Sequence, residues 1–139
     1  MEIDPLAISA SALAAQRARM NLIAENLAHA DTTRTPEGGP YRRRKVVFEA
    51  HGSAFPGLPS AEPSRGVRVV GVVDAQTPFR RIHQPGHPDA DAEGYVSLPN
   101  VNPVMEMIDL MAATRAYEAN VSAIQALKSM MQKALELGR

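Results

Sequence analysis

The residues of this sequence best suited to binding a metal ion are two histidines and three carboxylates, His83, His87, Asp89, Asp91 and Glu93. Imidazole nitrogens suit zinc or nickel, and alternating carboxylates offer oxygen ligands to calcium. No helical pattern holds both histidines on one face, and the sixth-position glycine and distal glutamate of an EF-hand loop are absent. We therefore expect no metal or other cofactor, and interpret the segment as a solvated turn that closes a β module.

Other catalytic patterns are absent from the sequence. It contains no cysteine, and no Gly-x-Ser-x-Gly, His-Glu-x-x-His or glycine-rich phosphate-binding motif. The remaining histidines, His29 and His51, are interpreted as a helix-end residue and a loop residue. The sequence therefore predicts a protein that is not an enzyme.

A run of four basic residues, RRRK at positions 42–45, could contact a nucleic acid or an anionic lipid. On a strand, alternate side chains point to opposite faces, so these charges would not form one patch, and no aromatic residues are interleaved for base stacking. Over the whole chain, 15 basic and 15 acidic side chains cancel. We expect a solvated strand edge, no nucleic-acid partner and no direct membrane insertion, because no segment reaches the roughly 18 apolar residues of a span.

Proline and glycine divide the chain into helical ends and a non-helical middle. Ten of the 11 prolines and eight of the nine glycines lie between residues 36 and 103. Asp4-Pro5 and Asn102-Pro103 each place a capping side chain before a proline at the first helical position. These features predict helices over residues 6–35 and 104–137, and Gly138 fits a helix end.

Both predicted helices carry apolar residues at heptad-like spacing, which favours a coiled coil. Apolar residues occur on further sides as well, so we expect the helices to pack against other copies or related chains; a self-contained helical hairpin is the alternative. Asn26 and Asn120 either fix the register between packed helices or face solvent. The predicted assembly-interface residues are Leu6, Leu13, Met20, Ile23, Asn26, Leu27, Met107, Leu110, Tyr117, Asn120, Val121, Ile124, Met131 and Leu135.

The middle of the chain has the composition of short strands and turns. Residues 41–50 and 67–73 are predicted strands, the second unusually rich in valine, and residues 79–83 and 95–98 are shorter strand candidates. Residues 51–66 are expected to form a mobile loop. The predicted fold is α+β: N- and C-terminal helices paired as a coiled-coil stem (residues 1–35 and 100–139), with a small β-rich module (residues 36–99) inserted between them.

Several strings resemble the bacterial flagellar basal-body rod proteins. Residues 12–28, ALAAQRARMNLIAENLA, are similar to the N-terminal signature of rod and hook proteins. Five further strings resemble the proximal rod proteins, namely TTRT at 32–35, GGPYRR at 38–43, PGHPDADAEGYV at 85–96, PNVNPV at 99–104 and RAYEANV at 115–121. The resemblance covers nearly the whole chain. One departure is visible, because the family usually reads Asn-Ile-Ala-Asn where this chain has Asn26, Leu27, Ala28 and His29.

The resemblance implies a structural subunit of the proximal rod, which crosses the periplasm as a drive shaft. It implies self-assembly with FlgB, FlgF, FlgG and FliE, contact with the inner-membrane ring, helices lining an export channel, and passage through the flagellar type III export apparatus. The first residues are acidic where a secretory signal is basic, so we expect export without a cleavable signal peptide. The alternative function is a soluble helical module that binds another protein's amphipathic helix.

Overall fold

The computed structural model describes residues 5–50 and 66–138. The capping residue Asp4 and almost all of the loop predicted at 51–66 lie outside them. The observed elements are helices at the two ends and four short strands between, as the sequence predicts for an α+β fold. In chain order they are α1 (Pro5–Ala28), β1 (Arg44–Ala50), β2 (Val67–Asp74), β3 (Arg80–His83), β4 (Tyr95–Leu98) and α2 (Pro103–Leu137).

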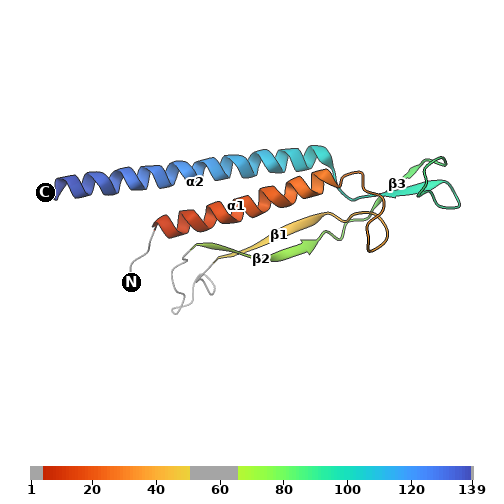
Figure 1. The fold of residues 1–139 in the computed structure, drawn as a ribbon, viewed down its shortest axis with the longest axis horizontal. Coiled ribbons are helices and arrows are strands. Elements are labelled where there is room, and N and C mark those ends of the chain that lie inside the picture. Colours follow the sequence, from red (N-terminus) through yellow and green to blue (C-terminus); the bar gives the residue numbers. More distant parts are fainter. Residues whose placement is uncertain (1–4, 51–65, 139) are drawn as a thin grey trace.

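The helices run antiparallel, side by side, and form two layers of an elongated molecule (Figure 1). The β1–β2 ribbon packs on the side of α1 away from α2, so α1 is the middle layer. The β3–β4 hairpin projects beyond the end where α1 finishes and α2 begins (Figure 1). Within the described residues, neither helix combines the length and the apolar character that crossing a bilayer requires.

The start of α2 follows the predicted capping pattern. The Asn102 Oδ1 accepts hydrogen bonds from the backbone N–H groups of Val104 at 3.1 Å and Met105 at 3.4 Å. Pro103 then occupies the first helical position, where a missing N–H costs nothing. The helix runs for 35 residues to Leu137, which confirms the predicted span within one residue.

The first helix ends next to His29, the predicted helix-end residue, and before residue 35, where the stretch without proline or glycine stops. It ends at Ala28 instead of continuing to residue 35, because the chain turns at once toward β1. The turn is closed by backbone hydrogen bonds from Ala30 N–H to the Leu27 carbonyl and from Thr32 N–H to the His29 carbonyl. β-Branched threonines and a proline follow in residues 32–36, and both disfavour a helix.

The β1–β2 ribbon is antiparallel, with Arg44 opposite Asp74 and Ala50 opposite Val67, and a bulge falls beside Val47. A hydrogen bond between backbone and side chain ties the ribbon to α1, because the Val67 N–H donates to Ser11 Oγ at 3.0 Å. At Gly66 the backbone has φ of +127°, and an added Cβ would lie 2.3 Å from Ser11 Oγ. Only glycine fits this close approach without strain.

The β3–β4 hairpin pairs Arg80 with Leu98 and His83 with Tyr95. Its strands begin close to the predicted positions, whereas β1 begins three residues later than predicted, at Arg44. Buried apolar side chains at this end are Val96 and Leu98 on β4 and Val101 in the link to α2. Tyr41 and Ala75 are buried in the segments that flank the β1–β2 ribbon.

Candidate assembly interface and its polar junction

The seam between α1 and α2 is narrow and lined by small or medium side chains. Ala15, Leu22 and Ile23 are buried on α1, and Ala113 is completely buried on α2. Thr114, the next residue, is exposed, but its Oγ1 lies 3.7 Å from the Met20 Sδ on α1, so the seam on α2 includes both Ala113 and Thr114. Small residues allow the two helix backbones to approach closely.

The structure places eleven of the fourteen predicted interface residues in partly or fully buried positions within the chain: Leu6, Leu13, Met20, Ile23, Asn26, Leu27, Leu110, Tyr117, Asn120, Val121 and Ile124. Met107, Met131 and Leu135 are more than half exposed. These three therefore do not hold the two helices of one chain together. Contact with neighbouring chains stays a prediction for all fourteen.

Asn26 lies at the centre of a buried polar junction between α1, β1 and α2, and its side chain is only 1% exposed. Its Nδ2 donates to the Arg44 carbonyl at 2.9 Å and to Glu106 Oε2 at 3.2 Å. Its Oδ1 accepts from the Arg44 N–H and from the Tyr41 hydroxyl, each at 3.0 Å. All four hydrogen-bonding positions of the amide are used. The solvent-facing alternative for Asn26 is therefore wrong.

Glu106, in the first turn of α2, is the buried charge of this junction and is fully inaccessible to solvent. The Arg43 Nε donates to Glu106 Oε1 at 2.5 Å, and its Nη2 donates to Asp109 Oδ2 at 3.2 Å. Arg19 on α1 lies 3.7 Å from the other Asp109 oxygen. A buried carboxylate is tolerated only when it is paired and hydrogen-bonded, and Arg43 with Asn26 meets both needs.

Asn100, in the link between β4 and α2, makes a second set of cross-links. Its Oδ1 accepts from the Arg43 N–H at 2.7 Å. Its Nδ2 donates to the carbonyls of Ala75 at 3.2 Å and Thr77 at 2.9 Å. Arg43 is thus held through its backbone by this link and through its side chain by α2. The junction and this link together connect both helices, the ribbon and the hairpin.

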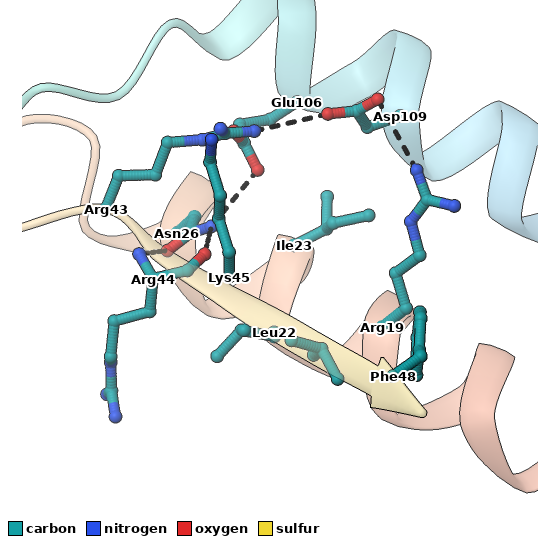
Figure 2. Close-up of a pocket in the computed structure, with 11 residues that line it drawn as sticks. Arg19, Leu22, Ile23, Asn26, Arg43, Arg44, Lys45, Phe48, Glu106 and Asp109 are labelled. Atoms are coloured by element: carbon teal, nitrogen blue, oxygen red, sulfur yellow. Dashed lines mark hydrogen bonds and ion pairs between the residues drawn. The ribbon is translucent and has the colours of Figure 1, made fainter. Parts of the chain in front are cut away.

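An open hollow of about 360 Å³ lies beside the junction, between α1, β1 and the start of α2. Figure 2 shows Asn26, Arg43 and Glu106 meeting at one end, with Arg19 and Asp109 at the other. Leu22, Ile23 and Phe48 supply an apolar floor. Glu106 and Asp109 pair with Arg43 and Arg19, so these charges orient three elements, and Lys45 also lines the hollow.

Two families of flagellar proteins match the two ends of this chain. Residues 6–34 match the family described as flagella basal body rod protein, and residues 92–137 match the family described as flagellar basal body rod FlgEFG protein C-terminal. Across the whole length, the chain is 44% identical to the flagellar basal-body rod protein FlgC of Bacillus subtilis, with 96% of each chain covered. It is 46% identical to FlgC of Salmonella typhimurium, covering 95% of this chain and 94% of the relative.

A more distant relative agrees. FlgC of Borreliella burgdorferi is 40% identical over 94% of this chain and 93% of its own. The chain belongs to the FlgC family of flagellar basal-body rod proteins. It is a structural subunit of the bacterial basal-body rod, and the alternative of a soluble helical protein-binding module is not favoured.

The polar junction of this FlgC-family chain was not found from the sequence. Arg43 was assigned to a solvated strand edge and Glu106 to no site, because 63 positions separate the two residues. Glu106 lies one heptad before Ala113, but only the structure shows that this side of α2 meets α1. Asn26 was identified as a candidate, but its partners were not.

The basic run does not form the solvated strand edge that was expected. The Arg42 guanidinium lies 4.3 Å from the centre of the Phe79 ring, and Arg43 pairs with Glu106 in the junction. Arg44 forms an ion pair with Glu25 on α1. The Tyr41 hydroxyl accepts a hydrogen bond from Arg44, and this contact raises the pKa of Arg44. Lys45 is exposed, lines the hollow beside the junction and has no described partner, so the run anchors the ribbon mainly through its three arginines.

The carboxylates and histidines of the hairpin contact separate neighbouring residues and do not converge on one point. Asp89 accepts from Thr33 Oγ1 at 2.8 Å and pairs with Arg34. The Asp91 Oδ1 accepts from the backbone N–H of Tyr95 at 2.8 Å, and this bond lowers the pKa of Asp91. The His83 ring packs edge-on against Tyr95. In the part of the chain that the structure describes, no three histidine or acidic side chains are grouped for a metal ion.

His29, which stands where the family usually has asparagine, stacks on Tyr41 with ring centres 4.7 Å apart. Its Nδ1 lies 3.1 Å from Thr32 Oγ1. The ring thus closes the turn after α1 and covers the tyrosine whose hydroxyl binds Asn26. The other candidate, Asn120, donates to the Ala116 carbonyl of its own helix at 2.8 Å, and its role in register stays a prediction.

Proposed function

We propose that this FlgC-family subunit acts in the proximal rod through its two helices, with residues 1–35 and 100–139 as the assembly stem and residues 36–99 as the insert. The observation that carries the proposal is the outer side of α2. Val104, Met105, Met107, Ile108 and Met111 are all more than half exposed there. Five apolar side chains exposed together within two turns of a helix favour a contact with another protein.

The proposed partners are other copies of this chain and the rod proteins FlgB, FlgF, FlgG and FliE, with the inner-membrane ring as a further neighbour. The subunit would line the export channel in the periplasm-spanning rod. It would also be a substrate of the flagellar export apparatus, which a sequence without cysteine suits, because no disulfide must form after transport. Its role is mechanical and not catalytic, since the charged groups of the junction are paired with one another.

The test is complementation of a bacterium that lacks its own FlgC. The unchanged chain should restore swimming. The double variant Met107→Asp, Leu135→Asp should abolish incorporation into basal bodies, because buried unpaired charges at an interface cost several kcal/mol. Both positions are exposed in the chain, so folding should be preserved, as circular dichroism would show.

The matched control is Gln125→Asp, Gln132→Asp, which adds the same charge at two exposed polar positions of the same helix. It should swim like the unchanged chain. Normal swimming by the Met107 and Leu135 double variant would contradict the proposed role of the stem.

A further inference from the structure

Methionine is concentrated and exposed on α2. Of the six methionines that the structure describes, five lie on this helix, and their exposed fractions range from 52% to 58%. They are Met105, Met107, Met111, Met130 and Met131. The sixth, Met20 on α1, is partly buried in the seam, and its Sδ lies 3.7 Å from Thr114 Oγ1. Methionine is ordinarily a buried residue, so an exposed series on one helix points to a use other than packing within the chain.

The first three of these methionines, which we call the methionine triplet, lie within about two turns at the start of α2. Val104 and Ile108 stand among them and are also more than half exposed. The two acidic residues of these turns, Glu106 and Asp109, both pair with Arg43, and Figure 2 shows their carboxylates reaching toward the arginines. The surface around the triplet therefore carries no unpaired charge within these two turns.

Exposure leaves the three thioether sulfurs of the triplet open to a two-electron oxidant such as hydrogen peroxide. A sulfur lone pair attacks one peroxide oxygen, and the S–O bond forms as the O–O bond breaks. The hydroxide that departs takes up the proton of the transferred oxygen and becomes water, so sulfur is oxidised by two electrons and the peroxide is reduced. The product is methionine sulfoxide, which is polar and which reductases convert back to the thioether.

We propose that the methionine triplet is an oxidation site, and that its sulfoxide form keeps the subunit out of the rod until a methionine sulfoxide reductase restores the thioethers. The effect on assembly rests on the proposed rod function, in which another chain covers this surface. A sulfoxide oxygen buried there would lack a hydrogen-bond donor, since the exposed side chains around it are apolar. Oxidised subunits are therefore rejected before incorporation, while the surface is still open to solvent.

Met130 and Met131 are equally exposed, but their surroundings differ. Lys128, Lys133 and Glu136 are exposed within two turns of them, so this end of the helix is already polar. A lysine ammonium group can also donate a hydrogen bond to a sulfoxide oxygen. We expect oxidation at these two positions to leave incorporation unchanged, which makes them the internal control.

The first measurement is the rate of oxidation at each methionine of the purified full-length chain. Hydrogen peroxide is added, and mass spectrometry of peptides follows the sulfoxide at each position. The three residues of the triplet should react about ten times faster than Met20, because susceptibility follows exposure. In urea the four rates should become equal. Equal rates in the folded chain would contradict the assignment of the site.

The second measurement is made in a bacterium that lacks its own FlgC and its methionine sulfoxide reductases. After a short sublethal exposure to hydrogen peroxide, cells with the unchanged chain should build about one-tenth as many new basal bodies as untreated cells. Cells with the triple variant Met105→Leu, Met107→Leu, Met111→Leu should match untreated cells, since leucine is apolar, similar in volume and not oxidised. Peroxide damage to other proteins is the same in both strains. Restoring a reductase should rescue the unchanged chain.

The matched control, Met130→Leu with Met131→Leu, should stay as sensitive to peroxide as the unchanged chain. Equal sensitivity of the triple variant would overturn the proposal, and so would resistance of the control. If the triple variant does not swim without peroxide, its three single variants take its place. Each should be less sensitive than the unchanged chain, and three single variants of unchanged sensitivity would equally overturn the proposal.

The two measurements separate the oxidation site from the rod function. Failure of the unchanged chain to restore swimming without peroxide would remove the proposed function and leave the oxidation rates of the purified chain standing. Normal swimming together with undiminished assembly after oxidation of the triplet would remove the effect on incorporation and leave the rod function standing.

Discussion

Asn26, near the end of α1, donates a hydrogen bond of 3.2 Å to Glu106, in the first turn of α2, although 80 positions separate them in the chain. Both side chains are almost completely buried. The contact joins the helices at the end from which the hairpin projects. The relative position of α1 and α2 is therefore set by a polar contact at this end and by apolar packing along the rest of the seam.

Replacing Asn26 by leucine should destabilise the chain strongly. The substitution leaves the Arg44 backbone groups, the Tyr41 hydroxyl and one Glu106 oxygen without their partner in a buried site. We expect a loss of about 2–4 kcal/mol in the free energy of unfolding, measured with urea. Asn21→Leu, at an exposed position of the same helix, should change it by less than about 0.5 kcal/mol. Equal effects of the two substitutions would contradict the role of Asn26.

Arg43→Met should be more damaging than removing the whole ion pair. The single substitution leaves the Glu106 carboxylate buried with Asn26 as its remaining described partner, at an expected cost of about 3–5 kcal/mol. The double variant Arg43→Met, Glu106→Leu should recover part of that loss. A double-mutant cycle in urea would measure the coupling. Purely additive effects would show that the pair is not coupled.

Gly66→Ala should loosen the ribbon from α1. The added Cβ meets Ser11 Oγ at 2.3 Å, and the positive φ is unfavourable for alanine. We expect a loss of more than about 1 kcal/mol and faster hydrogen exchange at the Val67 N–H. Gly71→Ala is the control, because a Cβ there meets nothing within 4 Å. If Gly66→Ala and Gly71→Ala change the free energy of unfolding equally, the close approach to Ser11 does not contribute to stability.

The Asp91 carboxylate should titrate below the ordinary range of an aspartate in an NMR experiment. The Tyr95 N–H is the largest cause, followed by the Glu93 N–H and Arg81, and all three favour the charged form. Because the folded pKa is lowered, the stabilisation is complete above an unfolded pKa of about 3.9 and is lost as the pH falls through the lower folded value. Asp91→Asn should remove this pH dependence from the hairpin. A titration midpoint for Asp91 within the ordinary range of an aspartate would contradict the predicted lowering of its pKa.

The helices and strands could be predicted from local sequence features, whereas the polar junction around Asn26 could not. Proline and glycine placement and the Asn102 cap located α2 within one residue, whereas the end of α1 depended on a turn stabilised by tertiary contacts such as His29 on Tyr41. Asn26 was a candidate because an amide among apolar neighbours is unusual in a helix. Its partners Tyr41, Arg44 and Glu106 are distant in sequence, and only the folded chain brings them together.

The anchoring of Arg43 has a consequence for how the subunit would carry load. Its backbone is bound by Asn100, at the base of the hairpin, and its guanidinium by the first turn of α2. A rotation imposed on the hairpin therefore cannot be absorbed by a compliant linker at this point. It would reach the long helix as torsion, and the stiffness of that coupling would be set by two hydrogen-bonded side chains.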